Sequence, residues 1–377
     1  MQGVQFGSTP ADSFTVVNAT EIRAHFPATL ANGRHTIHLQ TNAAGVKEFA
    51  QMAVVDAPTF TAQALAYPGT KESVPNAVVY DPERAALGVS IWHPFTGETE
   101  FVHFASDHNV WQAPIALPLI NSYGFALSQD GNEWIAVEEN SLIHIDVNTL
   151  TRLASVVSPV NPDSSLQIAD MAVANDGTLV MFADVSYNCG ATLILYDPQT
   201  HAFDQPEYTA CRGHVGASSD GSRVLIAEYA NFGANDIFSV DTTAKTTSET
   251  GVPASTSAKP ELDRTGSRVV FDKTRVYDGQ YTHLGDLPGT TEAIVLNPEG
   301  TRAYAYDQSG KLIAYALDSP PVGGIFQQAG SPITLAASPG TQWAPPYIDT
   351  KVMMAITPDG KTVFIAGNDY VVVQPVP

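Results

Sequence analysis

Three side chains that can carry charge or exchange protons stand at the same position of a repeated pattern. Asp170, His214 and Lys259 each precede the glycine of a tight-turn motif by seven residues. A carboxylate, an imidazole and an amine held together can bind a polar ligand or a metal ion, or transfer protons. Asn76 and Glu292 fall near the equivalent place in other copies of the pattern. These five residues are the candidate ligand-binding set; the alternative is that they only supply polar walls for a solvent channel.

The composition excludes several classes of partner and cofactor. The chain has 18 Lys and Arg against 39 Asp and Glu, a net charge of −21, and no basic run. Such a field repels phosphate backbones, so we expect no nucleic-acid partner. No apolar run approaches the roughly 20 residues of a membrane span. The sequence has no Gly-rich phosphate loop, H-E-x-x-H or G-x-S-x-G motif, so neither a cofactor nor a metal site is predicted.

The turns that follow these residues belong to a longer repeat. Apolar stretches flank turns at Asp130-Gly131, Asp176-Gly177 and Asp220-Gly221, and the next turn glycine is Gly266. These glycines are 46, 44 and 45 residues apart. Asp-Gly between apolar runs predicts a β-hairpin, because both turn residues tolerate positive φ. A strand-rich period of roughly 40–50 residues is typical of β-propellers, in which each repeat is one four-stranded blade.

Seven innermost strands are expected, so the predicted fold is an all-β, seven-bladed β-propeller. The last repeat supplies only three strands before Pro377. We expect residues 60–67 to provide its outer strand, since pairing the two chain ends removes exposed sheet edges. The expected starts of the innermost strands are Asn76, Tyr123, Ile168, Gly213, Ala258, Glu292 and Val352.

Residues 1–58 do not follow the repeat. The run VQFGSTPADSFTVVNATEIRAHFPATLANGRHTIHLQTN resembles the second half of an IPT/TIG immunoglobulin-like domain. This predicts a partial Ig-like β-sandwich at 1–58 and a propeller at 59–377. The family's opening strands and a signal peptide are both missing from the sequence, so we expect a piece of a longer multidomain protein.

The propeller portion resembles the YVTN/lactonase-like propeller superfamily. The resemblance lies in segments such as AITPDGKTVFIAG, from Ala355, and LNPEGTRAY, from Leu296. It implies that ligands bind at the mouth of a central channel, on the face formed by the loops between blades and between the second and third strands. Enzymes of the superfamily concentrate acidic, basic and cationic residues in that channel, whereas here only Asp170, His214 and Lys259 form such a set.

Aromatic residues gather in the loops of the same predicted face. Exposed aromatics with polar neighbours suit recognition of a protein or sugar, and packing of the long loops against each other is the alternative. The candidates for ligand binding on this loop face are Trp92, His93, Tyr187, Tyr229, Phe232, Trp343 and Tyr347.

The two cysteines, Cys189 and Cys211, fall in loops that the predicted topology also places on this face. We therefore predict a disulfide between them and an oxidising compartment, with two free thiols as the alternative. Two cysteines offer too few ligands for a metal site.

The sequence thus supports two hypotheses. The first is a non-enzymatic binding module of an exported bacterial protein, at the cell surface, extracellular or periplasmic, that recognises a protein or glycan on the loop face. The second is a lactonase- or lyase-type enzyme with its site at the channel mouth. The sparse channel chemistry and the Ig-like module favour the first.

Overall fold

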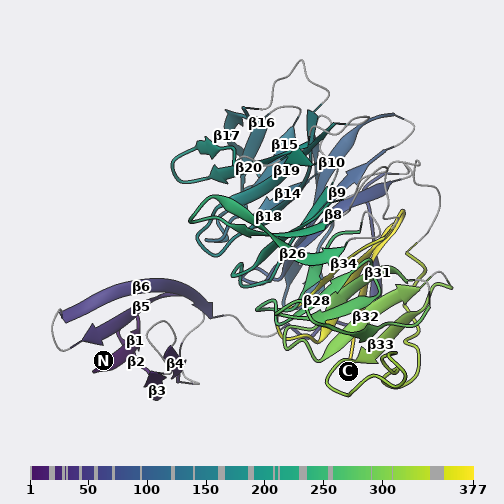
Figure 1. The fold of residues 1–377 in the computed structure, drawn as a ribbon. Coiled ribbons are helices and arrows are strands. Elements are labelled where there is room, and N and C mark those ends of the chain that lie inside the picture. Colours follow the sequence, from purple (N-terminus) through teal and green to yellow (C-terminus); the bar gives the residue numbers. More distant parts are fainter. Residues whose placement is uncertain are drawn as a thin grey trace. The chain divides into compact units, whose positions relative to one another are not determined.

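The computed structural model shows an all-β protein (Figure 1). It describes residues 2–16, 22–27, 30, 33–41, 45–54, 58–69, 73–93, 96–119, 124–138, 141–159, 166–185, 191–206, 209–210, 213–228, 236–253, 258–289, 291–307, 309–339 and 352–377. Every regular element in this described part is a β-strand, and none of it forms a helix that spans a membrane. The chain divides into two compact units, Met1–Thr59 with Pro82–Arg84, and Phe60–Asp81 with Ala85–Pro377.

The first unit contains a four-stranded antiparallel sheet and a separate hairpin. The sheet has the order β2 (Thr9–Pro10), β1 (Gly3–Phe6), β5 (Gly33–Thr41), β6 (Gly45–Val54), and the hairpin joins β3 (Ser13–Val16) to β4 (Ile22–His25). Its core is small: Val4, Phe6 and Leu30 are buried, and Phe6 meets Phe26 edge-on at 5.9 Å between ring centroids.

Within its described residues, the second unit contains one two-stranded hairpin and seven antiparallel sheets of three or more strands, which we number by the chain order of their first strands. Sheet 1 comprises β8 (Val74–Asp81), β9 (Ala86–Trp92), β10 (Thr99–Phe104) and β13 (Ile115–Leu119). Sheet 2 comprises β14 (Phe125–Leu127), β15 (Glu133–Glu138), β16 (Ser141–Asp146) and β17 (Arg152–Val157). Sheet 3 comprises β18 (Leu166–Val173), β19 (Leu179–Val185), β20 (Ala191–Asp197) and β21 (Ala202–Asp204), and β22 (Thr209–Ala210) also pairs with β20. A small hairpin joins β11 (Ser106–Asp107) to β12 (Val110–Trp111).

The remaining four sheets continue the series. Sheet 4 comprises β23 (Gly213–Ala217), β24 (Val224–Glu228), β25 (Asp236–Asp241) and β26 (Thr246–Pro253). Sheet 5 comprises β27 (Glu261–Leu262), β28 (Arg268–Phe271), β29 (Arg275–Asp278) and β30 (His283–Asp286). Sheet 6 comprises β31 (Thr291–Leu296), β32 (Arg302–Asp307) and β33 (Leu312–Ala316). Sheet 7 comprises β34 (Met353–Ile356), β35 (Thr362–Ala366), β36 (Tyr370–Pro375) and β7 (Gln63–Ala66), so a segment that precedes sheet 1 in sequence forms the outer strand of the last sheet.

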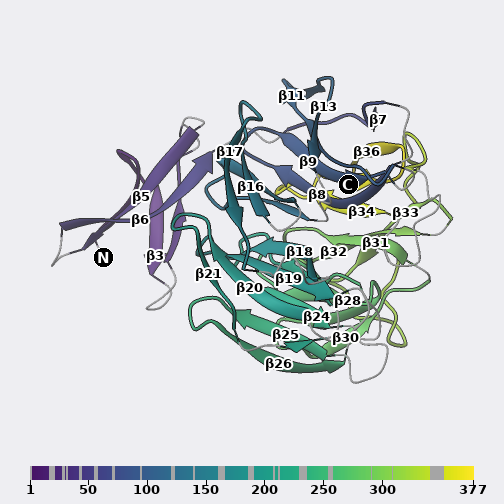
Figure 2. The same cartoon turned by 90° about the horizontal axis from the view of Figure 1, so that it is seen from above.

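We call β8, β14, β18, β23, β27, β31 and β34 the first strands of sheets 1 to 7. Each first strand neighbours the next one along the chain. β8 contacts β14, each later first strand contacts the next, and β34 contacts β8. In Figure 2, β8, β18, β31 and β34 lie toward the middle of the unit, and outer strands such as β13, β17 and β26 lie at its periphery. The middle strands are continuously buried, as β15 and β16 show, because both faces of each sheet are covered.

The core of this unit is divided among seven hydrophobic clusters, each between two consecutive sheets. One cluster lies between sheets 7 and 1, where the ring of Phe364 stacks on Tyr80 at 5.1 Å and meets Phe60 at 5.8 Å. Between sheets 1 and 2, Phe101 packs on Trp134 at 5.5 Å. Apolar burial therefore joins every sheet to the one before it, including the first to the last.

In sheets 2 to 7 the turns that follow the first strands share one hydrogen-bond pattern. In sheet 4 the N–H of Gly221 donates to the carbonyl of Ser218 at 2.8 Å, and Gly221 has a φ of +68°. Ser218 Oγ donates to Asp220 Oδ1 at 2.8 Å and accepts from the N–H of Arg223 at 3.0 Å. Both residues of the Asp-Gly pair tolerate positive φ, but only the glycine adopts it in the structure. The aspartate instead accepts hydrogen bonds that close the turn.

Neighbouring turns are also bonded to one another. The sheet-to-sheet bonds are Asn175 N–H to Gly221 O at 2.8 Å, Asp220 N–H to Arg264 O at 3.0 Å, and Arg264 N–H to Pro298 O at 3.2 Å. The side chain of Gln129 donates to Asn175 O, and Arg264 Nη2 donates to Pro358 O at 2.9 Å. Sheets 2 to 7 are thereby tied together at the C-terminal ends of their first strands.

Candidate functional site

The opposite, N-terminal ends of three consecutive first strands carry the predicted charged residues. Asp170 lies in β18, directly after a β-bulge at Ala169. His214 is the second residue of β23, and Lys259 stands two residues before β27 begins. A bulge re-aims the side chains beside it. The structure brings His214 and Lys259 into contact with Asp170. In the sequence, His214 lies 44 residues after Asp170, and Lys259 lies 45 residues after His214.

Asp170 is the centre of this contact. Its Oδ1 accepts from Lys259 Nζ at 3.0 Å and from the N–H of Met171 at 2.9 Å. Its Oδ2 accepts from the N–H of Val215 at 3.1 Å and lies 3.4 Å from His214 Nδ1. One carboxylate thus joins the first strands of sheets 3, 4 and 5.

Electrostatics keep Asp170 ionised. Its side chain is only 13% exposed, and burial by itself would raise the pKa. The ammonium of Lys259 and the hydrogen bond and charge of His214 outweigh burial and lower the pKa of Asp170 to about 2. By contrast, the side chains of His214 and Lys259 are 33% and 31% exposed, so both reach solvent while they contact the largely buried carboxylate of Asp170.

Sequence reasoning missed a fourth member, Glu261. It lies two residues after Lys259, and its carboxyl group interacts electrostatically with both Lys259 and Asp170. Burial raises the pKa of Glu261 to about 8; Lys259 opposes the rise and Asp170 adds to it. At neutral pH this half-buried carboxyl is therefore mostly protonated. We call Asp170, His214, Lys259 and Glu261 the first-strand cluster.

A signal for Glu261 does exist in the sequence. Counting five residues back from a turn glycine, rather than seven, gives one charged residue among small or apolar ones. The turn glycines are Gly131, Gly177, Gly221, Gly266, Gly300 and Gly360. The six residues at this position are Ala126, Ala172, Gly216, Glu261, Val295 and Ala355. Counting seven back gives Gly124, Asp170, His214, Lys259, Ala293 and Met353. At these two positions the charged residues and His214 are confined to sheets 3, 4 and 5, and sheets 2, 6 and 7 have small or apolar residues there.

The two remaining members of the predicted set lie in other sheets. Asn76 in β8 and Glu292 in β31 each stand at a shift of the strand register near the start of a first strand. Both are partly exposed. Asn76 therefore belongs to sheet 1 and Glu292 to sheet 6, whereas Asp170, His214 and Lys259 lie at sheets 3, 4 and 5.

Of the residues predicted to bind a ligand on the loop face, the structure describes Trp92 and His93. His93 is only 1% exposed; it has Ser73 Oγ at 3.5 Å and Glu100 Oε2 at 3.4 Å, so it is not the exposed contact residue that the sequence suggested. Its position directly after a buried strand explains the error. Trp92, the last residue of β9, is partly buried. The other candidates, Tyr187, Tyr229, Phe232, Trp343 and Tyr347, and both cysteines, Cys189 and Cys211, lie outside the described residues.

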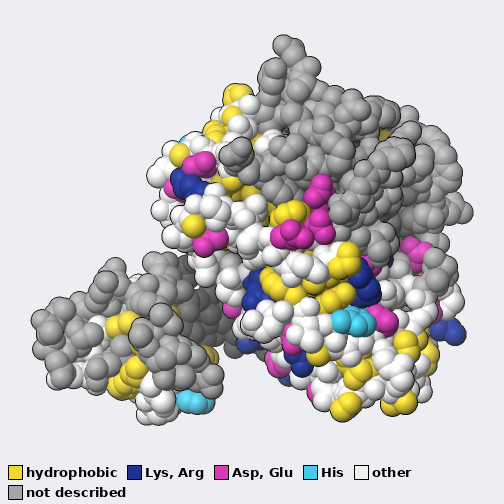
Figure 3. Space-filling view, viewed as in Figure 1, with side chains coloured by type: hydrophobic (Ala, Val, Ile, Leu, Met, Phe, Trp, Pro, Cys, Tyr) yellow, Lys and Arg dark blue, Asp and Glu magenta, His cyan; other side chains and the backbone are white. Residues whose placement is uncertain are grey.

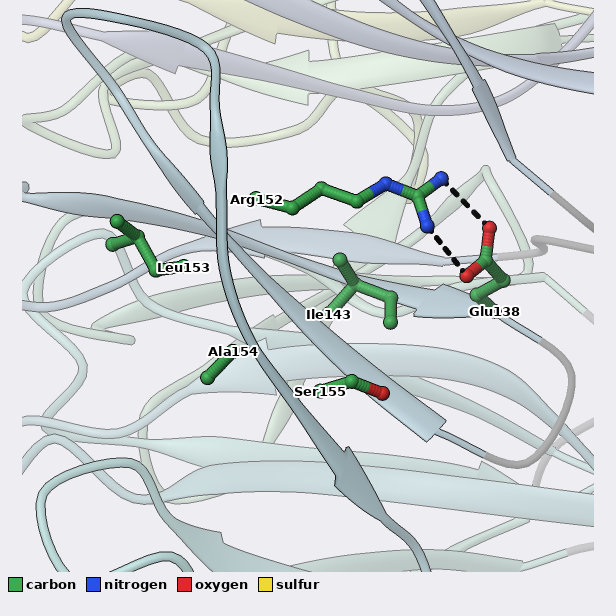
Figure 4. A pocket seen from close by; sticks show the side chains of 6 residues that line it. All are labelled: Glu138, Ile143, Arg152, Leu153, Ala154 and Ser155. Atoms are coloured by element: carbon green, nitrogen blue, oxygen red, sulfur yellow. Dashed lines mark hydrogen bonds and ion pairs between the residues drawn. The ribbon is translucent and has the colours of Figure 1, made fainter.

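A second polar feature lies in a hollow on the outer strands of sheet 2. It is lined by Glu138, Ile143, Arg152, Leu153, Ala154 and Ser155 (Figure 4). Arg152 binds both oxygens of Glu138, at 2.8 and 2.9 Å, and also donates to Pro118 O at 2.9 Å. Through these bonds the Arg152 guanidinium joins sheet 2 to sheet 1, so a structural role accounts for the Arg152–Glu138 ion pair.

The described charges show no extended basic surface on the face drawn in Figure 3. There, lysine and arginine side chains lie apart from one another, separated by acidic, polar and hydrophobic residues. Compared with models of known protein families and with curated proteins, the chain matches none. The two resemblances stated from the sequence therefore stay predictions, and the site must be interpreted from its own geometry.

Proposed function

We propose that the second unit is a seven-bladed β-propeller and that the first-strand cluster stands at the mouth of its central channel. Three observations support this architecture. The first strands contact one another in order and return from β34 to β8. A hydrophobic cluster lies between every pair of consecutive sheets, including the last and first. β7 completes sheet 7 by pairing with β36.

The proposed function is ligand binding at the N-terminal ends of the first strands. The observation that carries it is the contact of Asp170 with His214 and Lys259, which leaves the two basic side chains about one-third exposed. The opposite ends are tied by bonds between turns and offer backbone that is already paired. A binding module for a protein or glycan uses the first end, where polar groups with unused hydrogen-bonding capacity converge.

The proposed setting is an exported bacterial surface protein, in which an IPT/TIG-like module precedes the propeller. The division of the chain after Thr59 and the separate hydrophobic core around Val4 and Phe6 support two independent modules. The predicted disulfide belongs to the same proposal, because it requires an oxidising compartment.

Array binding tests this function. The labelled chain is applied to arrays of glycans and of extracellular proteins, beside a double variant, His214→Gln with Lys259→Met, and a control, Lys245→Met. Lys245 forms a similar ion pair with Asp204, at 2.7 Å, on the exposed outer part of the fold. We expect the control to bind like the wild type and the double variant to lose its signals. Signals that survive in a folded double variant contradict the proposed site.

A lactonase- or lyase-type activity is the second candidate, and one observation favours it. Asp170 lies beside Nδ1 of His214, an arrangement that orients an imidazole so that Nε2 can act as a general base, and Glu261 is a protonated carboxyl nearby. Hydrolysis of simple δ-lactones tests it. His214→Gln should reduce kcat by about 100-fold or more if His214 is the base. Hydrolysis at the buffer rate, or a rate that His214→Gln leaves unchanged, removes this candidate.

A further inference from the structure

The first-strand cluster holds both hydrogen-bond donors and acceptors within one small area. Lys259 Nζ has three N–H groups and uses one on Asp170. His214 turns Nδ1 toward Asp170, which directs Nε2 away from that carboxylate. Because Asp170 already receives four polar groups, its capacity is largely used, and it serves as the residue that positions the two basic side chains.

The surroundings restrict what these donors can meet. At the same level, sheets 2, 6 and 7 present Gly124, Ala293 and Met353. A Cβ on Gly124 would lie 3.7 Å from Met171 Cγ and 3.8 Å from the Cα of Asp170, so the backbone of sheet 2 passes close to β18 beside the cluster. A ligand therefore has its charged or polar contacts on one side and small or apolar contacts on the other.

We propose that the first-strand cluster binds the carboxylate of a single uronic acid residue, with Lys259 and His214 as donors and Asp170 positioning them. This inference rests on the proposed ligand-binding function and names its ligand class. Charge-assisted hydrogen bonds from an ammonium and an imidazolium to a carboxylate are the strongest polar contacts that these side chains can make.

A sugar acid fits better than an acidic peptide because the site offers acceptors as well as donors. Glu261 lies two residues after Lys259, and its carboxyl group can accept hydrogen bonds. A uronic acid carries hydroxyl groups that can donate to such acceptors, whereas an aspartate or glutamate side chain offers only its carboxylate. The net charge of −21 disfavours a polyanionic chain, which limits the ligand to one acidic residue.

The charges facing the ligand site predict how binding varies with pH. They come from β18 (Asp170), β23 (His214), the segment before β27 (Lys259) and β27 itself (Glu261). Raising the pH through about 8 ionises Glu261 next to Lys259. The new negative charge works against a bound carboxylate, so affinity should fall as the pH rises from about 7 to about 9.

The test compares two glycosides that differ only at C6: methyl α-D-galactopyranosiduronate, which carries a carboxylate, and methyl α-D-galactopyranoside, which carries a hydroxymethyl group. Ligand-observed NMR titration of the full chain gives the Kd of each. At pH 6 we expect the uronoside to bind at least about tenfold more tightly, a difference of about 1.4 kcal/mol. Lys259→Met should remove that preference, and Lys245→Met should keep it.

Other outcomes separate this inference from the proposed function. Equal affinity for the two glycosides, a preference that survives in a folded Lys259→Met variant, or no saturable uronoside binding at tens of millimolar overturns it. If the array signals still depend on His214 and Lys259, the proposed function stands and only the ligand class is wrong. Tighter binding of N-acetyl-L-aspartate than of the uronoside also overturns it, in favour of a peptide carboxylate.

Discussion

At the residue scale, Asp170 connects stability to the site. It accepts polar hydrogens from Lys259, Met171 and Val215 and lies beside His214, so one side chain fixes the spacing of three strands. Its pKa of about 2 lies below the ordinary value of 3.8. A lowered folded-state pKa means that the ionised group stabilises the fold above pH 3.8, and that this contribution disappears as the pH falls through 2.

Asp170→Asn should therefore destabilise the second unit by about 2 kcal/mol at neutral pH, because the amide lacks the charge that pairs with Lys259. The difference from the wild type should shrink as the pH falls from about 4 to about 2. Urea denaturation at a series of pH values measures it. Asp204→Asn, which breaks the exposed pair with Lys245, is the control and should change stability little. A pH-independent difference for Asp170→Asn would contradict this account.

Glu261 should behave in the opposite way. Its folded-state pKa of about 8 is above the ordinary 4.5, so its neutral form is compatible with the fold, and stability is lost as the pH rises from 4.5 through 8. Glu261→Gln removes that loss. We expect the variant to melt a few degrees higher than the wild type near pH 8 and at the same temperature near pH 4. A variant that melts lower at both pH values would show that Glu261 stabilises the fold when ionised.

The sequence located part of this site because the turn glycines set a common register. Asp170, His214 and Lys259 share one position in that register, and the structure joins them. Glu261 was not predicted as a site residue because a single acidic residue among small and apolar ones forms no motif, and only its burial makes it unusual. The burial of His93 was equally hidden, since exposure of a loop residue depends on packing that local sequence does not specify.

At the element scale, the contacts of the turns after the first strands of sheets 2 to 7 explain why glycine occupies each of these turns. Gly221 has a φ of +68°, and a Cβ there would lie 2.5 Å from the backbone nitrogen of Asn175 in the turn of sheet 3. Gly251 in β26 is the matched control, with a φ of +75° and nothing within 4 Å of its Cβ position. The two glycines therefore share the conformational requirement and differ in the contact between sheets.

Gly221→Ala should accordingly destabilise the unit more than Gly251→Ala. The positive φ costs both variants about 1 kcal/mol, and the clash with backbone atoms adds roughly 1–3 kcal/mol to the first alone. Urea denaturation of the two variants gives the comparison. Equal losses would mean that the turns of sheets 3 and 4 are not packed as tightly as the structure indicates.

The elements themselves were largely predictable. Alternating turn signals and apolar runs marked the strands, and the apolar runs of β15 and β16 are buried in the structure. The hydrogen bonds of the turns were less predictable from the sequence. The Ser218 hydroxyl closes its turn by bonding to Asp220 and to the N–H of Arg223, and the Asp-Gly signal alone does not specify these bonds.

At the scale of the whole molecule, the compartment is the property most open to a simple test. Cys189 and Cys211 were predicted to pair from topology. Thiol titration of the denatured, unreduced chain should find no free thiol, since a disulfide survives denaturation. Two titratable thiols would remove the main reason for placing the protein in an oxidising compartment, and would leave the fold and the first-strand cluster unaffected.

The central claim is that a ring of seven sheets binds its ligand where Asp170, His214 and Lys259 meet. A crystal structure of the chain soaked with methyl α-D-galactopyranosiduronate tests it most directly. The account predicts seven sheets closed by β7 and β36, with the ligand carboxylate within hydrogen-bonding distance of Lys259 Nζ and His214 Nε2. Ligand bound at the turn end or on the outer strands, with both basic side chains unoccupied, would contradict it.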